Sequence, residues 1–121
     1  MHVLVVDDNR DILNTTVRLL RHSGFRAWAA TSGLIALELA ERIQPDHILL
    51  DVMMPDMDGW EVLRHLKGNP ATAGLPVLFH TDGSEPEDDA AAILLGAIGV
   101  IKKGSFDFVD FVARIRMATI T

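Results

Sequence analysis

The sequence contains no cysteine and no long apolar run. Without cysteine the chain can form neither a disulfide-rich secreted module nor a zinc site of the ribbon type. Its longest apolar stretch, residues 90–101, holds two glycines and is shorter than the ~20 residues that a membrane-spanning helix needs. The first residues lack a basic region followed by an extended apolar run, so no signal peptide is recognisable. We therefore expect a soluble, cytoplasmic protein with no membrane partner.

Basic residues are also scarce. Lys and Arg total 11 against 17 Asp and Glu, which gives a formal net charge of -6. Binding to nucleic acid through neutralisation of phosphates needs a basic face, and no cluster of Lys and Arg supplies one here. We do not expect this segment to bind nucleic acid directly.

The chain is 121 residues long and 49% hydrophobic, which suits one compact domain over residues 1–121. Short runs rich in Val, Ile and Leu alternate with segments of helical periodicity. This alternation predicts an α/β fold, in which helices cover both faces of a five-stranded parallel sheet. The expected strands are Val3–Val6, Phe25–Ala29, His47–Leu50, Val77–His80 and Ile98–Lys102.

Apolar residues at helical spacing predict five helices. Gly24 follows the first of them, at a position where a left-handed residue is favoured, and Asp58 is placed to cap the third. The apolar stripes lie within Leu13–Leu20, Ala36–Ile43, Val62–Leu66, Ala90–Gly96 and Phe108–Ile115.

Charged and polar residues gather where the expected strands end. Asp7 and Asp8 follow the first strand, Asp51 the third, Thr81 the fourth and Lys103 the fifth. In an open parallel sheet, ligands bind at this carboxyl edge. Clustered carboxylates repel one another unless a cation lies among them, and Mg²⁺ prefers carboxylate oxygens, a carbonyl and retained waters. The convergence favours a magnesium site over the alternative, solvated acids that cap the following helices, as Asp8 could for the first.

The residues at this edge match a known family. Residues 5–9 (Val-Val-Asp-Asp-Asn), residues 51–59 (Asp-Val-Met-Met-Pro-Asp-Met-Asp-Gly), Thr81 and Lys103 closely resemble the receiver domain of two-component response regulators. The resemblance covers essentially the whole chain, and residues 51–59 are its most specific part. It implies a flavodoxin-like fold with strand order 2-1-3-4-5.

The resemblance also implies roles for individual residues. Asp51 would be the phosphoacceptor, and Mg²⁺ would be held by Asp8, Asp51 and the backbone carbonyl of Met53, with Asp7 acting mainly through water. The other two residues of the cluster, Thr81 and Lys103, would contact the phosphoryl oxygens.

The same resemblance implies partners and a reaction. The donor would be a phosphohistidine on a sensor histidine kinase or a histidine phosphotransfer protein. The domain would catalyse only its own phosphorylation and the hydrolysis of the resulting acyl phosphate, so it would be a signalling switch and not an enzyme acting on other substrates.

Three positions depart from the family's pattern. Asp82 stands where Ala or Gly is usual, Val100 where an aromatic residue is usual, and Gly104 in place of Pro. These departures keep a second hypothesis open, a receiver-like interaction module that no longer switches by phosphorylation. An aspartyl-nucleophile phosphatase would need a general acid two residues after Asp51; this residue is Met53, which cannot transfer a proton, so we set that hypothesis aside.

The segment Ala90–Ile101 carries no charged residue. A surface helix normally shows a polar face, whereas a helix that is apolar all round is usually covered. Because Ile93, Leu94 and Leu95 cannot all face the sheet, we expect this surface to form a homodimer or to bind an effector. The alternative is a harmlessly exposed leucine.

Overall fold

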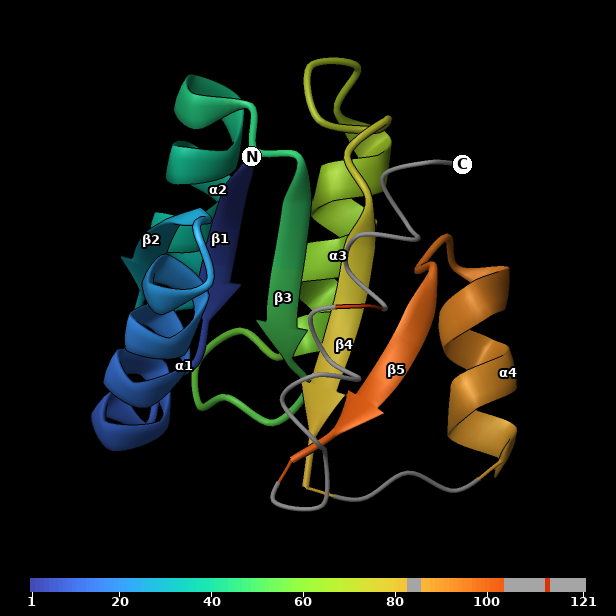
Figure 1. Cartoon of the computed structure of the whole chain (residues 1–121). Helices are drawn as coiled ribbons and strands as arrows, with labels where there is room; N and C mark the ends of the chain where they lie inside the picture. Colours follow the sequence, from blue (N-terminus) through green and yellow to red (C-terminus); the bar gives the residue numbers. More distant parts are fainter. Residues whose placement is uncertain (83–85, 104–112, 114–121) are drawn as a thin grey trace.

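The computed structural model describes residues 1–82, 86–103 and 113. Five strands form one parallel sheet in the order β2-β1-β3-β4-β5, as the sequence predicts (Figure 1). The strands are β1 (His2–Val6), β2 (Arg26–Ala30), β3 (His47–Asp51), β4 (Val77–Thr81) and β5 (Gly99–Lys102). The described helices are α1 (Arg10–His22), α2 (Gly33–Ile43), α3 (Gly59–Gly68) and α4 (Pro86–Leu94). Apart from residue 113, the segment of the predicted fifth helix, within 108–115, lies outside the described residues.

Helices pack on both faces of the sheet, as predicted. Apolar residues of α1 pack with Val3 and Val5 on one face. Residues of α2, α3 and α4 pack with Leu4 and Val6 on the other. All five residues of β3 and all five of β4 are buried, which is why each strand contains an uninterrupted apolar run, Ile48–Leu50 and Val77–Phe79, and not an alternating pattern. No helix among the described residues combines the length and apolar character that crossing a bilayer demands.

Every strand end agrees with the prediction to within one residue. The shift at β2 has a local cause, because the N–H of Phe25 bonds the carbonyl of Leu20 at 3.0 Å and thereby closes the end of α1. Gly24 has a φ of +93°, the left-handed conformation expected after the helix. Phe25 therefore belongs to the helix termination, and the strand begins at Arg26.

The residue that caps α1 differs from the one considered in the sequence analysis. Asn9, not Asp8, caps this helix, since its side chain accepts hydrogen bonds from the N–H groups of Asp11 at 3.0 Å and Ile12 at 3.1 Å. The carboxylate of Asp8 is consequently not used as the cap. Asp58 caps α3 as predicted and accepts from the N–H of Glu61 at 2.9 Å.

The start of α3 is pressed against the end of β3. The N–H of Gly59 bonds the carbonyl of Val52 at 2.8 Å, and a Cβ at Gly59 would collide with the carbonyl oxygen of Asp51 and lie 2.9 Å from the Cα of Val52. Only glycine allows this approach. It fixes the position of α3 relative to the carboxyl edge of the sheet.

Replacing Gly59 by Ala is expected to lower the free energy of unfolding by about 1–3 kcal/mol, because the added methyl meets backbone atoms that cannot move aside. Gly68→Ala is the matched control at the other end of α3, where a Cβ meets nothing within 4 Å. Urea denaturation followed by circular dichroism would compare the two. Equal stability of both variants would show that the approach of α3 to β3 is not tight.

Two histidines of the sheet, His47 and His80, are buried. Burial lowers the pKa of both, and that of His80 falls to about 4; the charge of Lys103 adds to this shift, while Asp7 and Asp82 oppose it. Since the pKa of His80 lies below its unfolded value of 6.5, its neutral form stabilises the fold above pH 6.5. This contribution is lost as the pH falls toward 4.

Between pH 7.5 and pH 5, His80 alone is expected to remove about 2 kcal/mol from the free energy of unfolding. His80→Phe should reduce this loss by that amount, whatever its effect on stability at pH 7.5. Urea denaturation at several pH values would measure the slope for both proteins. An identical slope in the variant would contradict the shifted pKa.

Candidate functional site

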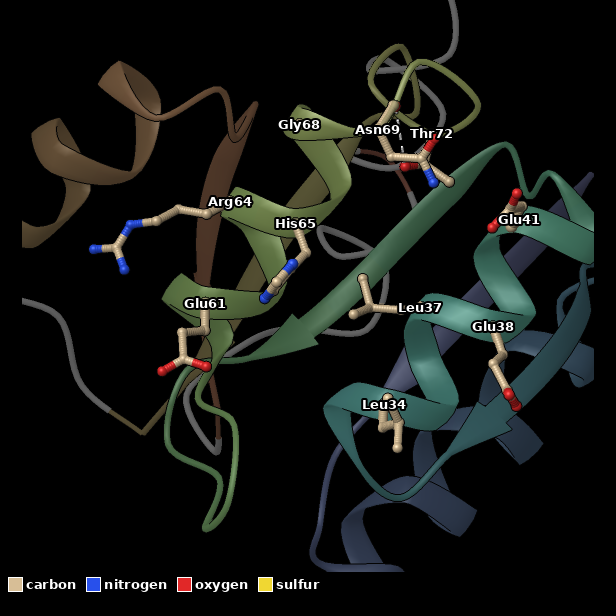
Figure 2. Close-up of a pocket in the computed structure, with 10 residues that line it drawn as sticks. All are labelled: Leu34, Leu37, Glu38, Glu41, Glu61, Arg64, His65, Gly68, Asn69 and Thr72. Atoms are coloured by element: carbon tan, nitrogen blue, oxygen red, sulfur yellow. Dashed lines mark hydrogen bonds between the residues drawn. The ribbon is translucent and has the colours of Figure 1, made fainter.

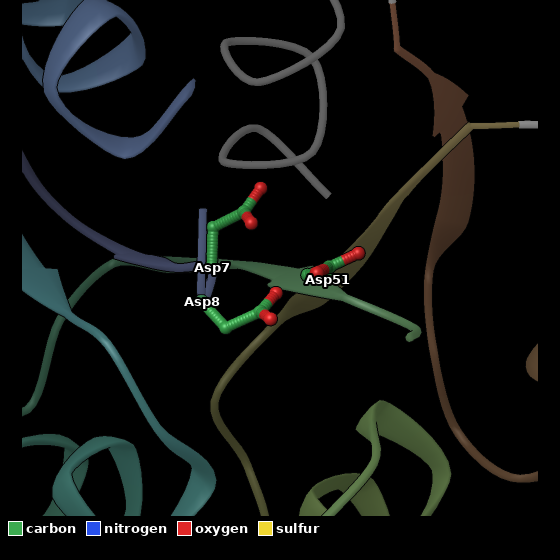
Figure 3. Close-up of side chains that lie close together, drawn as sticks. All are labelled: Asp7, Asp8 and Asp51. Carbon is green, nitrogen blue, oxygen red and sulfur yellow. The ribbon is translucent and has the colours of Figure 1, made fainter. Parts of the chain in front are cut away.

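The carboxyl edge of the sheet brings the predicted acidic residues together. Asp7 follows β1, and Asp51 is the last residue of β3. One carboxylate oxygen from each of Asp7, Asp8 and Asp51 lies within 4.8 Å of the other two. Figure 3 shows these three side chains at the ends of neighbouring strands. Asp7 and Asp51 are buried, whereas Asp8 is exposed, so the cluster can be reached from solvent on the side of Asp8.

Lys103 partly neutralises this cluster. Its Nζ lies 2.8 Å from Oδ2 of Asp7 and donates a hydrogen bond to Oδ1 of Asp51 at 3.0 Å. The backbone N–H of Lys103 also bonds the carbonyl of Thr81, which holds the end of β5 against β4. With all groups ionised, three carboxylates against one ammonium leave two negative charges at the site.

The surroundings of Asp51 disfavour its negative charge. Burial raises the pKa of Asp51 to about 6; the charge of Asp7 and a hydrogen bond with Asp8 act in the same direction, and Lys103 opposes them. Burial also acts to lower the pKa of Lys103, but its hydrogen bonds to Asp7 and Asp51 outweigh this effect and the net shift is upward. An additional cation close to Asp51 would therefore strongly favour the ionised form of its carboxyl group.

Both oxygens of Asp7 are engaged by the chain itself. Oδ1 accepts a hydrogen bond from the backbone N–H of Asn9 at 2.9 Å, and Oδ2 is the partner of Lys103. Asn9 therefore has two functions, as cap of α1 and as support of the acidic cluster. Neither function of Asn9 was predicted from the sequence, although a short Asp-x-Asn turn before a helix is a signal for both.

The other predicted site residues, Thr81 and Met53, differ in their exposure to solvent. Thr81 is the buried last residue of β4. Met53 lies two residues after Asp51, and its side chain is 76% exposed. Asp82 is exposed and, with Lys103 and His80, lines a cavity of about 390 Å³ against α1. Asp82, the acid that departs from the family's pattern, thus lines the same cavity as Lys103.

Comparisons with known proteins agree with this arrangement. The family model of the response regulator receiver domain matches residues 3–116. Response regulator MprA of Mycobacterium leprae is 36% identical over 116 residues, which are 96% of this chain and 50% of that protein. A probable cyclic di-GMP phosphodiesterase of Vibrio cholerae is 40% identical over 101 residues, which are 84% of this chain and 23% of that protein. The chain thus spans half or less of the length of these two relatives.

Solved structures match over nearly their whole length. The chemotaxis protein CheY4 of Vibrio cholerae has a TM-score of 0.89 at 27% identity, with 97% of both chains covered. A putative response regulator from Chloroflexus aurantiacus has a TM-score of 0.90 at 27% identity, with 99% of this chain and 98% of that chain covered. Asp7, Asp8, Asp51 and Lys103 at the carboxyl ends of the strands are called the acidic edge below. From the fold, the acidic edge and these matches together, we conclude that the chain belongs to the receiver domain family of response regulators, the signalling switches of two-component systems.

Proposed function

We propose that Asp51 is the phosphoacceptor of this receiver domain and takes its phosphoryl group from a phosphohistidine on a sensor histidine kinase or a histidine phosphotransfer protein. The observation that carries the proposal is the position of the Asp51 carboxylate, which is buried among two other carboxylates and 3.0 Å from Nζ of Lys103. Because such donors act inside the cell, we propose a cytoplasmic location.

The donor set fits Mg²⁺. Three carboxylates within 4.8 Å of one another are only partly neutralised by Lys103. Since both oxygens of Asp7 are engaged by the chain, Asp8 and Asp51 would bind the ion directly, together with the backbone carbonyl of Met53, and Asp7 would act through water. When bound, the ion would offset the negative charge that builds up on the phosphoryl oxygens during transfer.

The residues of the chain have distinct parts in this transfer. An oxygen of Asp51 attacks the phosphorus while the bond from phosphorus to the donor's histidine nitrogen breaks. Lys103, which now holds Oδ1 of Asp51, would move its ammonium to a phosphoryl oxygen, and the hydroxyl of Thr81 would donate to another. Positioning and charge stabilisation are the main contributions that phosphoryl transfer needs from a protein.

A second proposal concerns α4 and the turn that follows it. Within the predicted surface Ala90–Ile101, the side chains of Ile93, Leu94, Leu95 and Ile98 are 59%, 86%, 39% and 45% exposed. An apolar surface of this kind supports a homodimer or an effector contact. It is also what the alternative function, an interaction module that does not switch, would use, and Val100 in place of an aromatic residue favours that alternative.

Incubation with a small phosphodonor and Mg²⁺ should add one phosphoryl group to the chain, measured as intact mass. Asp51→Ala should abolish the addition, because it removes the nucleophile. Asp56→Ala is the matched control, an exposed acid in the same loop, and should react as wild type does. A chain that is never modified supports the interaction module, and modification of Asp51→Ala would place the nucleophile elsewhere.

Mg²⁺ alone should bind weakly and change the fluorescence of Trp60, which is half-buried next to Gly59 and packs 4.9 Å from Phe79. Trp28→Phe leaves Trp60 as the only tryptophan reporter. In that background Asp8→Ala should abolish the response, because it removes a direct ligand.

The control is Asp11→Ala, which removes an exposed acid from the first turn of α1 and should preserve the titration. Affinity should also fall about tenfold from pH 7 to pH 5, since protons compete for Asp51, whose pKa is about 6. An unchanged titration in Asp8→Ala would sink the metal assignment.

A further inference from the structure

A groove separate from the acidic edge lies between α2 and α3. Its volume is about 580 Å³, and Figure 2 shows its lining side chains on the two helices and, for Asn69 and Thr72, in the segment that follows α3. The contribution of α2 is a stripe at positions i, i+3, i+4 and i+7, namely Leu34, Leu37, Glu38 and Glu41. This stripe is apolar near the start of α2 and acidic toward its end.

The facing helix has the same periodicity. From α3 the groove is lined by Glu61, Arg64, His65 and Gly68, again at i, i+3, i+4 and i+7. Two helical stripes side by side form ridges with a gap between them, and a third helix fits such a gap by packing its own ridge of side chains into it. The shape of the groove therefore favours a helix over an extended peptide.

The walls of the groove are fixed by close contacts. At the first residue of α2, a Cβ on Gly33 would lie 2.7 Å from Cγ2 of Val62 and 3.0 Å from Sδ of Met57. The two helices α2 and α3 are therefore in tight contact at this end of the groove. At the other end, Nε2 of Gln44 donates to the carbonyl of Ala71 at 2.9 Å. The groove thus exists before any partner binds, which lowers the entropic penalty of binding.

The side chains of the groove define the chemistry of its occupant. Leu34 is 66% exposed and offers an apolar anchor. Three exposed glutamates, Glu38, Glu41 and Glu61, stand against one arginine, Arg64, whose side chain extends away from α2 (Figure 2). A second copy of the chain bound symmetrically would bring like charges together. The charge therefore favours a basic partner over a homodimer.

We propose that this groove binds an amphipathic helix of a partner protein, in which Lys and Arg flank a stripe of leucine-like residues. The apolar stripe contacts Leu34 and Leu37, and the flanking basic groups pair with Glu38, Glu41 and Glu61. This binding uses none of the residues of the acidic edge, so it does not depend on phosphorylation of Asp51.

A synthetic helical peptide with Leu at i, i+3, i+4 and i+7 and Lys at the flanking positions is the probe. It should bind with micromolar affinity by calorimetry and shift amide resonances of α2 and α3 in nuclear magnetic resonance spectra. Leu34→Gln should weaken binding about tenfold. Ile35→Gln, an exposed apolar residue of α2 that does not line the groove, is the matched control and should leave the affinity unchanged.

Charge is tested in the same way. Glu38→Lys should weaken binding severalfold, with a smaller effect at high salt, whereas Asp11→Lys on α1 should not. A scrambled peptide of the same composition should bind at least tenfold more weakly than the probe. The proposal is overturned if the scrambled peptide binds equally well, if Leu34→Gln and Ile35→Gln lose affinity alike, or if the peptide does not bind. A dimer in sedimentation analysis that Leu34→Gln dissociates would also overturn it, because it identifies the occupant as a second copy.

Discussion

The ammonium group of Lys103 lies between Asp7 and Asp51, 2.8 Å from the first and 3.0 Å from the second. The buried carboxylates of Asp7 and Asp51 and the exposed carboxylate of Asp8 lie within 4.8 Å of one another. Without the positive charge of Lys103, these three negative charges would repel one another strongly. Because the lysine follows β5 and the aspartates follow β1 or end β3, the contact also joins strand ends that are distant in sequence. The compensation is incomplete, and the remaining negative charge is what makes the site suited to a divalent ion.

The local details around this contact serve the same geometry. The backbone N–H of Asn9 donates a hydrogen bond to the carboxylate of Asp7, and the side chain of Asn9 caps α1. Because Gly59 has no Cβ, α3 can begin directly against the backbone of Asp51. Each of these residues acts by positioning a carboxylate or the loop beside it. The proposed chemistry therefore depends on backbone placement as much as on the ionised groups.

The sheet and the acidic edge could be predicted from the sequence because both follow from periodicity. Buried parallel strands are continuous apolar runs, and residues after such runs meet at one edge. The identity of the cap was less accessible, since Asp8 and Asn9 are both good caps and the local backbone decides between them. The bridging of Asp7 and Asp51 by Lys103 and the groove between α2 and α3 depend on how distant segments pack, which no local pattern contains.

We propose that Lys103 competes with a metal ion for the carboxylates of Asp7 and Asp51, and that it is needed when the phosphoryl group arrives. The decisive measurement is a titration of Lys103→Met with Mg²⁺ at pH 8 and constant ionic strength, followed by Trp60 fluorescence. The variant should bind Mg²⁺ more tightly than wild type, since a competing positive charge is gone, and should be phosphorylated more slowly by a small phosphodonor. Unchanged or weaker Mg²⁺ binding, or phosphorylation at the wild-type rate, would contradict it.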